Sequence, residues 1–231
     1  LRSFYRSTIR DTNQRDHAIW GSMVLAFFFC LRASEYASTP AKTKHYIRVQ
    51  DVSFTDRHGR PAANREEAQA VHLFFRSSKA DQANRGCSRS LYRSGHKSCC
   101  PVLAAWSLRI IGEQMGSEAK DPFCSYPDTR GTRRQVSVAI ISAAVKKAAT
   151  AHGLPCAKFS SHSLRSGGAT EMFLGGCSDT TVQLFGRWES DAYKAYIRID
   201  RDRNIQISSR MMSLFNKVYH TQSHNHQFML A

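Results

Sequence analysis

The sequence predicts a mixed α+β domain, mainly helical with a small antiparallel β-sheet. Apolar residues recur at three- and four-residue spacing in several long segments, and short apolar runs separated by turn residues lie between residues 46 and 93. The first pattern places apolar side chains on one face of a helix, whereas the second is typical of strands. The chain has 231 residues and 42% hydrophobic content. A chain of this size can bury a substantial core.

The charge balance predicts a polyanionic partner. Lys and Arg number 33 against 18 Asp and Glu, which gives a formal net charge of +15 at pH 7. Such an excess favours nucleic acid binding. The basic residues are dispersed and form no cluster beside an apolar anchor, so we expect no membrane partner. The longest apolar stretch, residues 19–31, falls short of the roughly 17–25 residues of a spanning helix and predicts a buried core helix.

The N-terminal residues lack the apolar run and cleavage site of a secretory signal, so we expect a protein that is not secreted. The seven cysteines are an odd number at irregular spacing. This pattern favours reduced thiols over a disulfide framework.

The first part of the chain predicts one long helix followed by a sheet. Asp11 or Thr12 can cap a helix whose apolar periodicity continues to about residue 37, and Pro40 stops it. Three short apolar runs follow, which we expect to form antiparallel strands, at residues 46–54, 70–75 and 87–93. Between the second and third runs, residues 76–86 occupy the position of a hairpin connection.

The second part predicts a series of helices. Pro101 suits the first position of a helix that ends near Gly116, and another helix begins after Thr132 and ends before Gly153. Three short helices come next: residues 161–174, residues 178–185, and one capped by Ser190. Apolar spacing of four, three and four then predicts an amphipathic helix over residues 203–219, followed by a flexible tail over 220–231.

One stretch of the predicted short helices gathers side chains suited to phosphate chemistry. His162 and Arg165 lie three residues apart, which on a helix places both on one face. Trp188 follows, and then Tyr193 and Tyr196. Taken alone, the His–Arg pair is more typical of an ordinary helix surface, and the tryptophan of a core aromatic.

Two further pairs have ordinary explanations of their own. Arg32 and Glu35 can form a simple helix ion pair, worth only ~0.3–0.5 kcal/mol at a surface, yet they directly follow the long apolar run. Gly167 and Gly168 are unfavourable early in a helix, by about 1 kcal/mol each. Their presence suggests close approach to another backbone or to DNA.

Five motifs occur together in a particular order. They are LRASE at residues 31–35, Lys79 in the hairpin connection, HSLR at 162–165, GRW at 186–188 and AYIR at 195–198. This set resembles the catalytic domain of the tyrosine recombinase, or phage-integrase-like, family. The form GRWxSxAYxxYIR is most similar to recombinases of eukaryotic mobile elements of the Crypton and DIRS-like kinds. The resemblance implies the family's fold, a mainly helical α+β catalytic domain with a small antiparallel sheet.

The resemblance also implies a domain organisation. Residues 1–10 would be a linker remnant from a missing N-terminal DNA-binding domain. Residues 11–219 would form the catalytic domain, with the C-terminal amphipathic helix at 203–219, and residues 220–231 a flexible tail.

The implied activity is DNA strand cleavage and rejoining through a 3′-phosphotyrosyl intermediate, for integration or excision of a mobile element. Arg32 and Arg165 would bind the non-bridging phosphate oxygens, since guanidinium forks fit them bidentately. Glu35 would orient Arg32. Tyr196 would be the nucleophile, with Tyr193 as the alternative because the two tyrosines lie three residues apart on one predicted helix.

Two residues would move protons and one would pack the site. His162 would accept the tyrosine proton or hydrogen-bond the phosphate. Lys79 would protonate the departing 5′-oxygen, although Lys42, Lys44 and Lys97 compete for this role. Trp188 has only an indole N–H donor, so it would hydrogen-bond the phosphate and pack the site. The chemistry implies no cofactor and no metal ion.

The expected partners are double-stranded DNA and further copies of the chain, as a dimer on a site and a tetramer in the synapse, possibly through residues 203–219. The protein would act in the nucleus if it belongs to a eukaryotic mobile element, and otherwise in the cytoplasm with the DNA. Two other functions remain open: an inactive, domesticated DNA-binding remnant, and a type IB topoisomerase-like relaxing enzyme. A zinc site at His96, Cys99 and Cys100, with Cys87 nearby, is disfavoured because adjacent cysteines fit the usual ligand spacing poorly.

Overall fold

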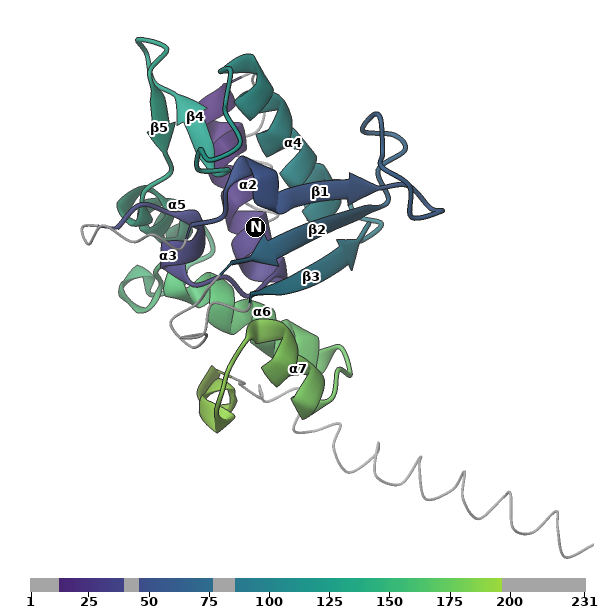
Figure 1. Ribbon diagram of the computed structural model, residues 1–231. Helices are drawn as coiled ribbons and strands as arrows, with labels where there is room; N and C mark the ends of the chain where they lie inside the picture. The colour runs from purple at the N-terminus through teal and green to yellow at the C-terminus, as the bar shows by residue number, and fades with distance from the viewer. Residues whose placement is uncertain (1–12, 40–45, 77–85, 197–231) are drawn as a thin grey trace, which may run out of the picture. The chain divides into compact units, whose positions relative to one another are not determined.

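The computed structural model describes residues 13–39, 46–76 and 86–196 (Figure 1). Over these residues the secondary structure is mainly helical, with a three-stranded antiparallel sheet and a separate two-stranded sheet. The predicted mainly helical α+β class is therefore confirmed. The predictions for the linker at 1–10, the amphipathic helix at 203–219 and the tail at 220–231 lie outside the described residues.

The long helix predicted to reach residue 37 is two helices. Helix α2 spans Gln14–Phe28 and is capped by Asn13, whose side chain accepts a hydrogen bond from the Arg15 N–H. The chain then breaks at Cys30, which has a positive φ of 48°, and at Arg32, which is extended. Helix α3 (Ala33–Tyr36) restarts because Glu35 accepts the main-chain N–H of Arg32 at 2.7 Å. Apolar residues continue across the break, so periodicity alone did not reveal it.

The three-stranded sheet lies where the sequence predicted strands. A 3₁₀ turn, η1 (Val49–Asp51), leads into β1 (Val52–Thr55), which pairs with β2 (Ala70–Phe75), and β2 pairs with β3 (Cys87–Tyr92). Both pairings are antiparallel, with β2 in the centre. The first strand is shorter than predicted because the 3₁₀ turn takes its first half. Residues 76–86 connect two antiparallel neighbours, as predicted for a hairpin connection.

Of the next two helices, the first begins at its predicted residue and the second begins later than predicted. Helix α4 (Pro101–Gln114) has Pro101 in its first turn. Helix α5 (Val138–Ala151) begins later than predicted, because Ser137 caps it through the Ile140 N–H. The residues before it instead form a small antiparallel sheet of β4 (Ser125–Pro127) and β5 (Arg133–Gln135), which the sequence did not predict.

The last three described helices follow a short 3₁₀ turn, η2 (Cys156–Lys158). Helix α6 spans His162–Leu174 and ends at Gly175, and helix α7 spans Asp179–Gly186 with Ser178 as its cap, both as predicted. The segment after Ser190 is the 3₁₀ helix η3 (Asp191–Tyr196) rather than an α-helix.

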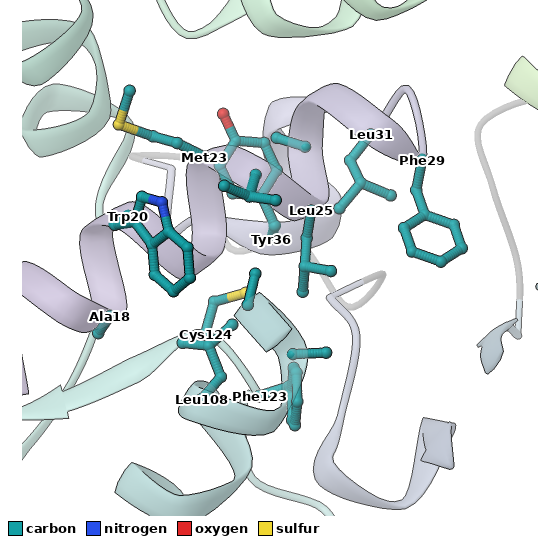
Figure 2. Packing of buried hydrophobic residues seen from close by; sticks show 14 of the residues in the cluster. Ala18, Trp20, Met23, Leu25, Phe29, Leu31, Tyr36, Leu108, Phe123 and Cys124 are labelled. Carbon is teal, nitrogen blue, oxygen red and sulfur yellow. The ribbon is translucent and has the colours of Figure 1, made fainter. Parts of the chain in front are cut away.

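Helix α2 forms the centre of the core. It packs against α4, α6 and the β4 strand. Figure 2 shows side chains such as Met23, Leu25 and Tyr36 in one cluster with Leu108 and Cys124, and all five are buried. The expectation that the apolar stretch at 19–31 is a core helix is confirmed for α2. Within the described ranges, no helix is both long and apolar enough to cross a membrane.

The sheet attaches to this core through its apolar face. The rings of Phe54 on β1 and Trp106 on α4 lie edge to face with centroids 4.8 Å apart, a geometry that aromatic pairs favour. Strand β2 ends at the buried Phe75, whose ring centre lies 3.8 Å from the guanidinium of Arg187, the residue that follows α7.

Candidate active site

Glu35 is the buried centre of an arginine cluster. Its side chain is 2% exposed and accepts the main-chain N–H of Arg32 at Oε2 and the Arg32 guanidinium at Oε1, at 2.7 and 3.2 Å. A second guanidinium, that of Arg187, donates to Oε2 at 2.7 Å. The structure therefore joins Arg32 to Glu35 through both the main chain and the side chain of the arginine.

Arg187 is the residue that sequence reasoning missed. It follows α7 as a left-handed cap with a φ of 59°, and its side chain is 5% exposed. Besides Glu35, the guanidinium donates to the Phe29 carbonyl at 3.2 Å and lies 3.8 Å from the centre of the Phe75 ring. An arginine after a helix is ordinary in a sequence. Its place inside the GRW motif was the one available signal.

Arg165 comes from the first turn of α6 and points into the same region. Its guanidinium donates to the Cys30 carbonyl and, at 2.8 Å, to the Gly186 carbonyl. The Trp188 ring covers the guanidinium, with 4.0 Å between the ring centre and the Arg165 Cζ. This is close cation–π stacking. Trp188 thus packs on Arg165 through its ring face.

Two successive carbonyls link the two predicted phosphate-binding arginines. Arg165 donates to the Gly186 oxygen, and Arg32 donates to the Arg187 oxygen at 2.9 Å. Arg32 stands at the break between α2 and α3, so its guanidinium comes from more than 100 residues away in the sequence. The structure brings Arg32, Glu35, Arg165 and Trp188 together around this short segment.

Two glycines allow the elements around the arginine cluster to pack closely. A Cβ on Gly168 would overlap the main-chain oxygen of Phe27 in α2, and a Cβ on Gly186 would overlap the Trp188 ring. The prediction that Gly168 marks close approach to another backbone is confirmed. Gly167 has a looser position, where a Cβ would lie 3.5 Å from the Phe27 ring.

The cluster carries an excess of positive charge. It holds three guanidinium groups and one carboxylate, which pairs with Arg32 and Arg187. Burial, together with the positive charges of Arg32 and Arg187, lowers the pKa of Arg165 to about 10. Burial also lowers the pKa of Arg187, while the Glu35 charge opposes this shift. With a pKa of about 10, Arg165 remains protonated at neutral pH and offers positive charge to an anion.

The remaining predicted site residues have different surroundings. His162 is the first residue of α6, is exposed, and lies one helical turn before Arg165. Tyr193 is buried, and its ring centre lies 6.1 Å from that of Trp188. Burial and the neighbouring Asp179 raise the pKa of the Tyr193 hydroxyl. The backbone of Tyr196 ends η3, but its side chain lies outside the described part of the structure, as does Lys79.

In the described ranges, no three His, Cys, Asp or Glu side chains lie close enough together to hold a metal ion. Two residues of the disfavoured zinc site have other surroundings. The His96 Nδ1 lies 3.2 Å from the Ser98 Oγ, and Cys100 is a buried residue directly before α4.

Comparison with known proteins agrees with this architecture. No family model matches the sequence, and no curated protein matches it either. Among solved structures, the XerH site-specific recombinase bound to its difH substrate in a pre-cleavage complex matches with a TM-score of 0.57 at 14% identity. The match covers 90% of this chain and 51% of that one. XerH bound to a palindromic difH substrate in a post-cleavage complex matches with a TM-score of 0.60 at 13% identity, over 90% and 50% of the two chains.

The chain thus spans about half the length of the XerH chains that it matches. At such low identity the likeness concerns the fold. The mainly helical arrangement with its small antiparallel sheet is the fold of the tyrosine recombinase catalytic domain.

Proposed function

We propose that this protein is a site-specific DNA recombinase that cleaves and rejoins DNA strands through a 3′-phosphotyrosyl intermediate. The observation that carries this proposal is the anchoring of Arg32 and Arg165 to the successive carbonyls of Arg187 and Gly186. Two guanidinium groups held at fixed positions suit the two non-bridging oxygens of one phosphodiester, where negative charge gathers during oxygen attack.

The arginines keep donors for such a ligand. A guanidinium has five N–H donors, and the bonds to Glu35 and to main-chain oxygens engage one hydrogen on each terminal nitrogen. Arg32 has the more open side chain, with 24% exposed, whereas Arg165 lies beneath Trp188. A phosphate would therefore meet Arg32 first and Arg165 at the base of the site.

The proposed reaction exchanges one phosphodiester for another. The Tyr196 oxygen attacks the phosphorus, its proton passes to His162, and the phosphorus–5′-oxygen bond breaks. Lys79 protonates the departing 5′-oxygen, so a 3′-phosphotyrosyl bond and a free 5′-hydroxyl result. Attack by a 5′-hydroxyl reverses these steps and joins the strands. The phosphodiester energy is retained, so the cycle consumes no nucleotide.

Several features support Tyr196 over Tyr193 as the nucleophile. Tyr193 is buried against Trp188, and the pKa of its hydroxyl is raised by burial and by Asp179. A raised pKa makes the phenolate, which is the attacking form, harder to reach. Tyr196 would need the cationic field of the arginines, which lowers the pKa of a nearby phenol.

The proposed partner is double-stranded DNA. The net charge of +15 suits a polyanion, and the two XerH structures with the same fold contain DNA substrates. We further propose a dimer on each site and a tetramer in the synapse, with residues 203–219 as a contact between copies. Integration or excision of a Crypton- or DIRS-like mobile element is the proposed biological role, with the nucleus as its place of action.

Covalent trapping tests the proposal. End-labelled duplexes of randomised sequence, nicked so that cleavage releases a short strand, are incubated with the protein in buffer containing EDTA. We expect a protein–DNA adduct that survives denaturing electrophoresis and contains phosphotyrosine. Tyr196→Phe should abolish the adduct, and Tyr193→Phe should retain it. No adduct with the native chain, or an adduct that persists in Tyr196→Phe, would contradict the proposal.

The same preparation separates the two other functions. Salt-sensitive duplex binding without any adduct would identify an inactive DNA-binding remnant. Relaxation of supercoiled plasmid by Tyr196-dependent nicking, with no site preference among the randomised duplexes, would identify a topoisomerase-like enzyme. A recombinase is expected to enrich particular duplex sequences in the adduct.

A further inference from the structure

We propose that Arg187 is a positioning residue for strand cleavage: it fixes Glu35, and through it the guanidinium of Arg32, without touching the DNA phosphate. The inference rests on the proposed function, since it assigns to Arg187 a place in the same site. Three observations support it. The Arg187 side chain is bound within the protein, its main-chain carbonyl accepts Arg32, and Glu35 pairs with both arginines.

The guanidinium of Arg187 is already engaged within the protein. Nη2 donates to Glu35 at 2.7 Å, and Nη1 donates to the Phe29 carbonyl at 3.2 Å. The Phe75 ring covers one face at 3.8 Å, and 5% of the side chain is exposed. Because both terminal nitrogens are bound and the group is buried, Arg187 is poorly placed to receive a phosphate. Arg32, at 24% exposed, is the open member of the cluster.

The main chain of Arg187 serves Arg32 directly. Its carbonyl accepts Arg32 Nη2 at 2.9 Å, and the preceding carbonyl, of Gly186, accepts Arg165. Arg187 has a φ of 59°, a conformation that residues other than glycine rarely adopt. The side-chain contacts with Glu35, Phe29 and Phe75 hold it there. The strained turn and the buried side chain thus act together to place two carbonyls beside two arginines.

Glu35 is shared between two cations. Oε2 accepts Arg187 and the main-chain N–H of Arg32, while Oε1 accepts the Arg32 guanidinium at 3.2 Å. Without Arg187, the buried carboxylate would have Arg32 as its partner in this cluster. We expect the Arg32 guanidinium then to move toward Oε2 and away from the phosphate position. A displacement of about 1 Å in such a group can slow a reaction by about 10²-fold.

A double-mutant cycle tests this role. Arg187→Met, Glu35→Gln and the double variant are compared in the trapping assay at saturating DNA, with DNA affinity measured separately. Arg109→Met is the matched control, because Arg109 also pairs with a glutamate, Glu113 at 2.7 Å, and stacks on a ring, Trp106 at 4.7 Å. Arg109 lies on α4, and its substitution removes the same charge as Arg187→Met.

We expect Arg187→Met to slow adduct formation about 100-fold while DNA affinity changes less than about threefold. The double variant should be no slower than the slower single variant, since both changes disable the same unit. Arg187→Lys should restore part of the rate by returning a cation beside Glu35. A native rate in Arg187→Met, multiplied losses in the double variant, or equal losses in affinity and rate would overturn the proposal.

Two further measurements keep the test decisive. Circular dichroism and thermal unfolding identify a variant that fails to fold. If Arg187→Met fails to fold, the rates of Arg187→Lys and Arg109→Lys are compared instead of those of the two methionine variants. If the native chain forms no adduct, the proposed function fails, and calorimetric binding of inorganic phosphate decides the role of Arg187. Weaker phosphate binding in Arg187→Met than in Arg109→Met supports it. Unchanged binding, or no phosphate binding by the native chain, overturns it.

Discussion

Gly168 of α6 lies against the main-chain carbonyl oxygen of Phe27 in α2, so closely that a methyl group at residue 168 would overlap this oxygen. The two helices therefore meet backbone to backbone. Arg165, one turn earlier on α6, can reach the Cys30 carbonyl just beyond α2 because of this contact. The position of the buried arginine depends on a residue that has no side chain.

Replacing Gly168 by alanine should separate the two helices. We expect Gly168→Ala to lower the free energy of unfolding by about 3 kcal/mol, since the overlap is with backbone atoms that cannot rotate away. Gly167→Ala is the matched control, because its Cβ would lie at an ordinary 3.5 Å from the Phe27 ring. It should be neutral or raise stability by up to about 1 kcal/mol through helix propensity. Denaturant unfolding measures both, and equal effects would contradict the packing argument.

Gly186 allows the Trp188 ring to lie on Arg165. A Cβ at residue 186 would overlap the indole, so Gly186→Ala should move the ring off the guanidinium and cost about 1–3 kcal/mol. In protein labelled with 5-fluorotryptophan, the ¹⁹F resonance of Trp188 is the one that Trp188→Phe removes. In Gly186→Ala this resonance should shift or broaden. Gly112→Ala, whose Cβ would lie 3.5 Å from the Ser117 Oγ, should leave this resonance in place. An unchanged resonance in Gly186→Ala would refute the prediction.

Asp51 fastens the end of β2 to η1. Its carboxylate accepts the Arg76 Nε at 3.1 Å and the Arg48 N–H at 3.0 Å, and the side chain is 2% exposed. Asp51→Ala leaves those donors without their acceptor and should cost about 2 kcal/mol. The exposed pair of Arg109 and Glu113 provides the comparison: Glu113→Ala should cost roughly 0.3–0.5 kcal/mol. Thermal unfolding of the two variants checks the order, and a reversed order would contradict it.

The Cys30 thiol should be unreactive despite its cationic neighbours. Burial raises the pKa of Cys30 to about 11, and this outweighs the opposing effects of Arg165 and Arg187. A raised pKa means less thiolate, so at pH 8 only ~0.1% of Cys30 would be ionised. Iodoacetamide at pH 8 should label the exposed Cys156 first and Cys30 only after unfolding, as read by peptide mass spectrometry. Labelling of both at one rate would disprove this.

The same shift has a consequence for stability. The unfolded thiol ionises near its ordinary pKa of 9.0 and the folded thiol near about 11, so between these values the folded chain holds more protons. Stability from this group is therefore complete below pH 9 and decreases as the pH rises toward 11. Unfolding of the native chain and of Cys30→Ala across this range should show a steeper decline for the native chain.

Local signals in the sequence determined much of the helical framework. Pro101, Ser178 and Gly175 act within one turn of their own helices, and each marks a helix end in the structure. The short apolar run at 70–75 became β2 with the same bounds. These features depend on hydrogen bonds and periodicity over a few residues, so neighbouring residues suffice to predict them. The motifs likewise grouped Arg32, Glu35, Arg165 and Trp188, and in the structure Arg32 pairs with Glu35 while Arg165 stacks on Trp188.

The tertiary structure decided what those four contact. The break after α2 is invisible to periodicity, because apolar residues continue through it, and β4 and β5 pair two segments without an apolar strand pattern. Arg187 is the clearest case: its partner Glu35 is 152 residues away, and its place in the GRW motif does not reveal that partner. Residue types fix which groups can bind a phosphate, whereas a buried charge acquires its role only from the groups that packing places around it.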